Sequence, residues 1–99
     1  MYGMIVQMLA APGKREELVA ILTESTGAMP GCLSYVVALD AANPDAVWVS
    51  EAWDSKGSHA ASLELPEVKA AIARGRPLIG GMGTFVETQP VGGHGLVAG

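Results

Sequence analysis

The sequence predicts a single domain of the α+β class, and three observations lead to this prediction. The chain has 99 residues, which is enough for one hydrophobic core and too few for two. Apolar residues make up 49% of the chain and charged residues 16%, so it can bury enough surface to fold. Segments with strand and helix patterns follow one another in the order strand, helix, strand, strand, helix, strand.

The first half of the chain predicts a strand, a helix and a second strand. Met4–Ala10 is an apolar run that is short for a helix and is followed by a Pro-Gly pair, so we expect a strand. Lys14–Met29 carries apolar residues along one stripe and charged residues on the opposite face, which is typical of an amphipathic helix. Leu33–Asp40 is rich in β-branched and aromatic residues, which favours a strand.

The second half predicts a strand that pairs with its predecessor, followed by a helix in two parts. Val47–Trp53 has strand character and comes after an Asn-Pro-Asp turn, so it should complete a hairpin. Asp54 or Ser55 is expected to cap the helix Lys56–Leu63. The second part, Pro66–Arg74, begins with a proline, which suits the first position of a helix.

The last expected strand is Gly83–Thr88, after a helix that Gly75 is expected to end. The whole order is that of a ferredoxin-like βαββαβ domain, in which a four-stranded antiparallel sheet carries two helices on one face. We expect this domain to span residues 1–90. Residues 91–99 form a Gly-rich tail, which a partner subunit could hold in place.

Both faces of the predicted sheet are apolar at its middle. Side chains alternate across a strand, so Val6 and Ile5 point to opposite faces, and so do Val37 and Val36. Two helices cover only one face, and an uncovered antiparallel face is normally polar. We therefore expect a second copy of the chain to cover the other face, as a homodimer with its sheets face to face. The alternative is a strand register that leaves the second face partly polar.

Composition and charge exclude several classes of function. The formal net charge is −4, so a nucleic acid is not an expected partner. Cys32 is the only cysteine and the two histidines are far apart, so we expect neither a disulfide nor a metal site. The chain has no apolar run of membrane-spanning length and no basic residue before Lys14, so no membrane span or secretory signal is expected. These features predict a soluble, cytoplasmic protein.

Three segments of the chain, taken in order, resemble one known family. They are Met29–Tyr35 (MPGCLSY), Val47–Ser55 (VWVSEAWDS) and His59–Ser62 (HAAS). Their order and spacing resemble the antibiotic biosynthesis monooxygenase (ABM) domain, in particular its small quinol-monooxygenase-like members. The resemblance covers roughly residues 4–90. It implies a dimeric α+β barrel with a ligand pocket between sheet and helices in each subunit.

The family that the sequence resembles contains several activities. Some members oxygenate phenolic or anthrone-like aromatics without a metal, flavin or haem, and others isomerise small phosphorylated sugars. Others degrade haem with an asparagine on the first strand and a tryptophan and a histidine on the second helix. Here the only asparagine is Asn43, in a turn, and the two helix positions fall on Ser62 and Ile72. Haem degradation is therefore not expected, and the resemblance implies no cofactor.

His59 is the main candidate for chemistry, because imidazole titrates near neutral pH and can take a phenolic proton. The alternative is a histidine that only bonds to backbone or solvent at a helix start. Glu51 lies in an apolar row of the third strand, where a carboxylate must be paired or have a raised pKa. It could orient His59 or polarise a bound hydroxyl. The alternative is a structural ion pair with Arg74 or Arg76.

Three further residues are candidates for substrate binding. Trp53 could stack on a planar ligand and Tyr35 could line the pocket, although both could simply belong to the core. Arg74 could bind an anionic substrate or complement the dipole of its helix. Trp48 points to the opposite face from Trp53, where the second copy is expected.

These observations favour a cofactor-independent monooxygenase that oxidises a small aromatic quinol or phenol with O₂. In this hypothesis His59 is the base, Glu51 orients it, and the rings of Trp53 and Tyr35 hold the substrate. The alternative is a non-catalytic small-molecule binding or stress-response accessory protein on the same scaffold. A small-sugar isomerase ranks third, because the sequence places few polar groups in the pocket.

Overall fold

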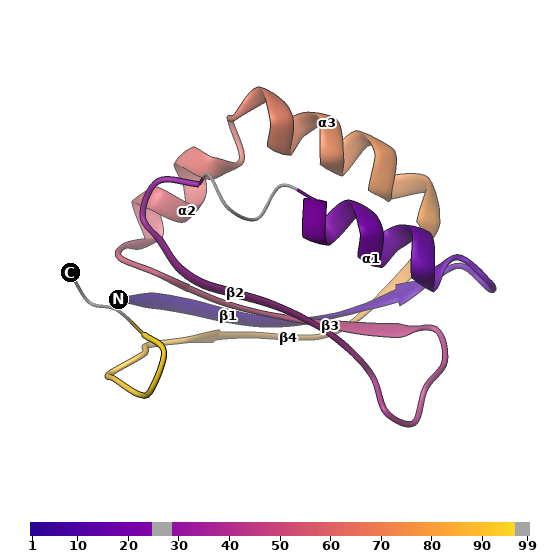
Figure 1. Cartoon of the computed structure of the whole chain (residues 1–99), viewed down its shortest axis with the longest axis horizontal. Helices are drawn as coiled ribbons and strands as arrows, with labels where there is room; N and C mark the ends of the chain where they lie inside the picture. Colours follow the sequence, from indigo (N-terminus) through magenta and orange to yellow (C-terminus); the bar gives the residue numbers. More distant parts are fainter. Residues whose placement is uncertain (25–28, 97–99) are drawn as a thin grey trace.

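The computed structural model of the chain describes residues 1–24 and 29–96. It contains one four-stranded antiparallel sheet with the strand order β2-β3-β1-β4. The strands are β1 (Tyr2–Ala10), β2 (Cys32–Leu39), β3 (Ala46–Trp53) and β4 (Ile79–Thr88). The predicted α+β class and the ferredoxin-like order of elements are confirmed (Figure 1).

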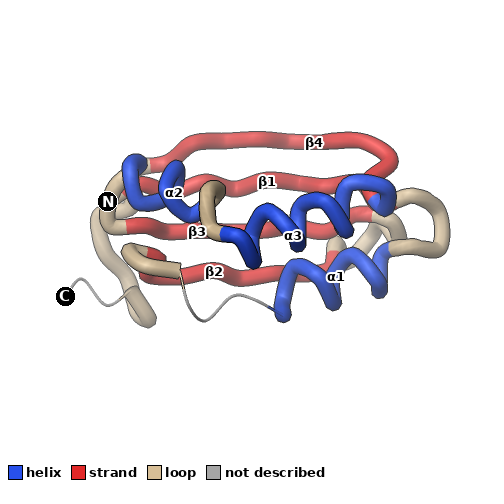
Figure 2. The backbone as a smooth tube through the Cα atoms, turned by 90° about the horizontal axis from the view of Figure 1, so that it is seen from above, coloured by secondary structure: helices blue, strands red, loops and turns tan. Residues whose placement is uncertain are grey.

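The helices of the described chain form a single layer on one face of the sheet (Figures 1 and 2). They are α1 (Arg15–Glu24), α2 (Lys56–Ser62), α3 (Pro66–Gly75) and the short 3₁₀ turn η1 (Arg76–Leu78). Seen from above, α1 runs beside α3, and α2 lies over the opposite end of the sheet from η1 (Figure 2). None of these helices is long and apolar enough to cross a membrane.

The structure differs from the sequence prediction mainly at the ends of elements. The first helix was expected to reach Met29, but residues 25–28 lie outside the described residues. Gly75 does not end its helix in a left-handed conformation: its φ is −76°, and the chain continues directly into η1. β4 begins at Ile79, earlier than predicted, and Gly81 pairs with Leu9 of β1. Glycines weaken a strand pattern, which is why this part of β4 resembles a loop in the sequence.

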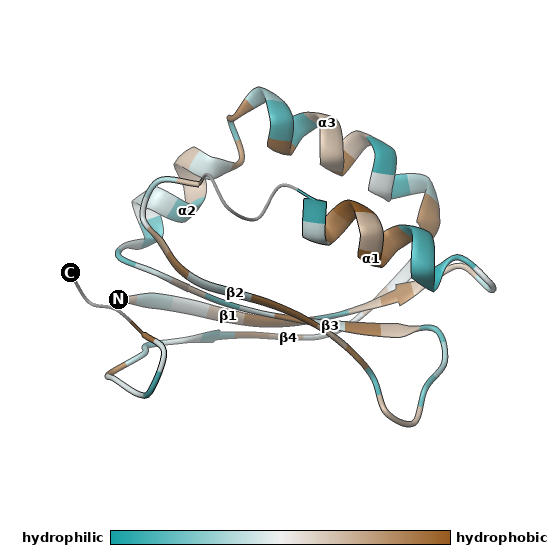
Figure 3. Ribbon diagram, in the orientation of Figure 1, coloured by the Kyte–Doolittle hydropathy of each residue, from teal (hydrophilic) through white to brown (hydrophobic). Residues whose placement is uncertain are grey.

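The core lies between the sheet and the helix layer. Val6, Val49 and Val37 stand in register across β1, β3 and β2, on the side that faces the helices. Leu18 of α1 is 1% exposed and belongs to the same core as the fully buried Val47. Hydrophobic residues are concentrated along β2 and α1, whereas polar residues interrupt α3 (Figure 3). The predicted alternation of side chains between the two faces is therefore confirmed.

The helices leave the other face of the sheet uncovered. Ile5, Val36 and Val86 lie on it in one cross-strand row and are 37%, 54% and 44% exposed. Ser50 stands in the same row, between Ile5 and Val36, and Gln7 follows in β1 on the same face. The second face is thus apolar in part and polar in part, which corrects the expectation of a uniformly apolar middle.

The start of α2 is fixed by a cap and by a close contact with the turn before β2. The Ser55 hydroxyl accepts a hydrogen bond from the Ser58 amide at 3.1 Å, as predicted for a helix cap. Gly31 has φ of +84°, and its carbonyl accepts a hydrogen bond from the Asp54 amide at 2.9 Å. A Cβ at position 31 would lie 2.6 Å from the Ser58 side chain, so only glycine fits. This contact holds the helical turn that carries His59.

Candidate functional site

His59, Glu51 and Trp53 form a cluster between the end of β3 and α2. Glu51 and Trp53 are two residues apart on one strand, so both side chains point toward the helices. Trp53 Nε1 donates a hydrogen bond to Glu51 Oε1 at 3.0 Å. His59 Nε2 lies 3.9 Å from the same oxygen, and the His59 ring meets the Trp53 ring edge-on with centroids 5.4 Å apart. The carboxylate oxygen therefore accepts a hydrogen bond from the indole and has the imidazole as a near neighbour.

The cluster is largely shielded from water. The side chain of Glu51 is 8% exposed and that of His59 is 17% exposed. Burial raises the pKa of Glu51, while the hydrogen bond from Trp53 and the nearby imidazole act in the opposite direction. The sequence left open an ion pair of Glu51 with Arg74 or Arg76. The structure instead gives Glu51 the partners Trp53 and His59.

A second group of side chains stands on the outer side of His59, and sequence reasoning missed it. The Tyr2 ring lies 5.7 Å from the His59 ring, and its hydroxyl donates a hydrogen bond to Glu87 Oε2 at 2.7 Å. This bond raises the pKa of Tyr2 to about 12. Lys56 Nζ lies 3.3 Å from the same Glu87 oxygen. The register that pairs Tyr2 with Trp53 is what brings the first strand to the site, and no local motif signals it.

A cavity of about 300 Å³ opens beside this cluster, between the sheet and α2 and α3. Glu51, Trp53, His59 and Tyr35 all line it, together mostly with apolar side chains. We call it the His59 cavity. Burial, followed by the charge of Glu51, raises the pKa of Tyr35 to about 12, so its hydroxyl remains a proton donor over the physiological range.

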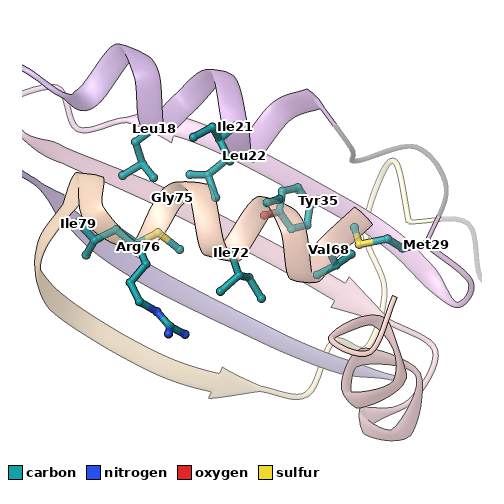
Figure 4. Close-up of a pocket in the computed structure, with 12 residues that line it drawn as sticks. Leu18, Ile21, Leu22, Met29, Tyr35, Val68, Ile72, Gly75, Arg76 and Ile79 are labelled. Carbon is teal, nitrogen blue, oxygen red and sulfur yellow. The ribbon is translucent and has the colours of Figure 1, made fainter. Parts of the chain in front are cut away.

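A second cavity, of about 320 Å³, lies between α1, α3 and the sheet (Figure 4). We call it the α1–α3 cavity. Leu18 and Leu22 extend into it from α1, and Tyr35 reaches it from β2 (Figure 4). The two cavities adjoin, because six residues line both: Met8, Leu22, Met29, Tyr35, Val68 and Ile72.

The structure brings four of the five predicted site residues together and leaves one apart. Glu51, His59, Trp53 and Tyr35 surround one cavity. Arg74 is 54% exposed, forms an ion pair with Glu24 of α1 and lines neither cavity. Within residues 1–24 and 29–96, no three His, Cys, Asp or Glu side chains gather as a metal site would require.

Comparison with known proteins places the chain in a family. The family model for antibiotic biosynthesis monooxygenase (ABM) matches residues 1–74, which include Glu51, Trp53 and His59. The chain therefore belongs to the ABM family, as its sequence motifs indicate. No curated protein matches the chain.

Solved structures agree with this assignment. A Chloroflexus aurantiacus J-10-fl protein that carries the family name is 58% identical, with a TM-score of 0.94 over 97% of this chain and 98% of that one. A Deinococcus radiodurans protein named for the same family is 24% identical, with a TM-score of 0.77 over 94% and 95% of the two chains. A Nitrosomonas europaea protein shows 19% identity and a TM-score of 0.79, over 92% and 99%. The last two likenesses concern the fold alone.

Proposed function

We propose that this protein is a cofactor-independent monooxygenase that oxidises a small aromatic quinol or phenol with O₂ in the His59 cavity. The observation that carries the proposal is the position of His59. Its imidazole is held beside a buried carboxylate at the wall of a mostly apolar cavity. A shielded apolar site with a few convergent polar groups is what binding and deprotonating an aromatic alcohol requires.

The reaction begins when the imidazole of His59 takes a proton from the substrate hydroxyl. Glu51 positions the ring and stabilises the imidazolium, since its oxygen lies 3.9 Å from Nε2. Trp53 and Tyr35 hold the aromatic ring, and the protonated Tyr35 hydroxyl is a suitable donor to the substrate oxyanion. Arg74 has no step in this scheme, because it is exposed and paired with Glu24.

The electrons for oxygen reduction come from the substrate itself. The anion passes one electron to O₂, and the resulting radical pair combines at a ring carbon to give a peroxide anion, which takes the proton held by His59 and becomes a hydroperoxide. The O–O bond then breaks, and the distal hydroxyl leaves as water with the proton from the same ring carbon, so that one oxygen atom stays on the ring. For a hydroquinone the balance is quinol plus O₂ giving hydroxyquinone plus water, with no external reductant.

The first test is oxygen uptake with a hydroquinone in the absence of NADH. We expect His59→Ala to lower the rate about 10²- to 10⁴-fold, the usual contribution of a positioned general base. His94→Ala is the matched control, because it removes the other histidine, which is exposed in the tail. Equal rates in wild-type protein and His59→Ala would remove His59 from its role as the base.

A non-catalytic small-molecule binder is the second candidate, because the described linings of the two cavities, taken together, include one imidazole and one carboxylate. Saturable quinone binding without any oxygen uptake would favour this candidate. A small-sugar isomerase is less well supported, since a mostly apolar lining leaves sugar hydroxyls without partners.

A further inference from the structure

The two cavities differ in chemistry although they adjoin. The His59 cavity contains the ionisable cluster of Glu51 and His59. Among the described residues, the lining of the α1–α3 cavity includes no acid and no histidine, and its polar side chains are Tyr35, at the boundary of both cavities, and Arg76. Arg76 is exposed, and its guanidinium points away from the α1 side chains (Figure 4). The described part of the α1–α3 cavity is therefore lined by apolar side chains.

This difference restricts what can fill the α1–α3 cavity. A ring system with hydroxyl groups on every ring would bury polar atoms there without hydrogen-bond partners, at a substantial cost in binding free energy. A hydrocarbon chain has no such requirement and gains affinity with each buried methylene. Tyr35 lines both cavities. A ring held beside His59 can therefore extend a substituent past Tyr35 into the α1–α3 cavity.

We infer that the substrate is a quinol or phenol with a hydrocarbon side chain, whose ring occupies the His59 cavity and whose chain occupies the α1–α3 cavity. This inference rests on the proposed function for the place of the ring. It adds the side chain as the feature that the protein selects. Ala71 and Gly75 of α3, which line only the second cavity, are then residues that determine chain length.

The inference is tested by binding without oxygen, so that no turnover is needed. Dissociation constants of methyl-, propyl- and pentylhydroquinone are measured under argon from the quenching of tryptophan fluorescence. We expect affinity to rise about fourfold for each added methylene until the cavity is full. Equal dissociation constants across the series would overturn the inference.

Two variants on α3 test whether the hydrocarbon side chain of the ligand lies in the α1–α3 cavity. Ala71→Phe fills the α1–α3 cavity, and we expect it to abolish the gain from propyl and pentyl chains while methylhydroquinone still binds. Ala73→Phe is the matched control, because it adds the same ring on the exposed side of the same helix. Ala71→Leu, a smaller change, shortens the longest tolerated chain if Ala71→Phe disturbs folding. If affinity still rises with the length of the hydrocarbon side chain in both Ala71 variants, the inference is wrong.

The experiments distinguish failure of the side-chain inference from failure of the proposed function. If affinity rises with side-chain length and this depends on Ala71, but no hydroquinone consumes oxygen, the two-cavity binding mode holds and the proposed function is wrong. If methylhydroquinone and pentylhydroquinone bind equally well and both are oxidised, the proposed function holds and the inference is wrong.

Discussion

Glu51 is the residue on which the electrostatics of the site depend. A carboxylate that is 8% exposed persists in a fold only when other groups satisfy it, and here Trp53 donates a hydrogen bond to Glu51 while His59 lies 3.9 Å away. Because its folded-state pKa is raised, the folded protein binds the Glu51 proton more tightly than the unfolded chain does. Stability therefore falls as the pH rises from about the ordinary value of 4.5 through the raised pKa.

Glu51→Gln should separate stability from activity. The amide oxygen can still accept the Trp53 hydrogen bond, but the variant has no charge to bury, so its melting temperature should exceed that of wild-type protein at about pH 8 and approach it at about pH 4. The oxidation of hydroquinone should slow, because the imidazolium loses its counter-charge. Thermal melts and oxygen uptake at both pH values test this. A variant that melts lower at pH 8 would show that the charge stabilises the fold.

Among single residues, the sequence predicted four side chains that line the candidate His59 cavity and did not predict three that gather beside His59. Glu51, Trp53, Tyr35 and His59 could be found because strand alternation and helix spacing are local patterns. Tyr2, Lys56 and Glu87 could not, because their meeting depends on the pairing of β1 with β3 and β4. Arg74 lies apart from the candidate cavity and pairs with Glu24; a cation near a helix end gives no indication of which way it points.

At the scale of elements, the connection between β2 and β3 is organised by Asp40. One carboxylate oxygen accepts the amides of Ala42 and Asn43 at 2.8 and 2.9 Å, and the other accepts Trp48 Nε1 at 2.7 Å. The Trp48 bond, followed by the two amides, lowers the pKa of Asp40 from 3.8 to about 2. One side chain thus ties the turn to the uncovered face of the sheet.

We expect Asp40→Asn to destabilise the hairpin in a pH-dependent way. A depressed folded-state pKa contributes stability that is present above about pH 4 and is lost as the pH falls toward about 2. The wild-type protein should therefore melt higher than the variant at pH 6, and the difference should vanish near pH 2. Melts followed by circular dichroism and by tryptophan fluorescence measure this. A constant difference across the range would assign the effect to geometry and not to charge.

The boundaries of elements were predictable where side chains carry the pattern. Apolar and β-branched side chains, together with the turn residues beside them, placed β1, β2 and β3 within two residues of their observed bounds. The start of β4 was missed because Gly80, Gly81 and Gly83 contribute no side chains to a pattern. A Cβ at Gly83 would meet the end of the Gln7 side chain, which would have to move aside.

At the scale of the whole molecule, we propose that a second copy of the chain covers the open face of the sheet. Members of the ABM family are commonly dimeric. Ile5, Val36 and Val86 supply exposed apolar surface there. Gln7 Oε1 already accepts a hydrogen bond from the Thr84 amide at 3.4 Å, and the Trp48 indole is bonded to Asp40. Because these polar groups have partners within the chain, covering them costs little.

Val36→Glu should convert a dimer into a monomer, because a carboxylate at the middle of the contact would be buried without a partner. Ala70→Glu is the control, since it adds the same charge on the exposed side of α3. Sedimentation velocity at micromolar concentration should show a dimer for wild-type protein and the control, and a monomer for Val36→Glu. A monomeric wild-type protein would contradict the proposed assembly.

The hydrogen bond between Tyr2 and Glu87 has a practical consequence. It joins the first strand of the domain to the last at the side of the His59 ring. A purification tag fused ahead of Met1 would therefore begin next to the residue whose ring lies 5.7 Å from the His59 ring, and its bulk would disturb the position of Tyr2. Kinetic work on this protein is best done after the tag has been cleaved, or with the tag at the other terminus.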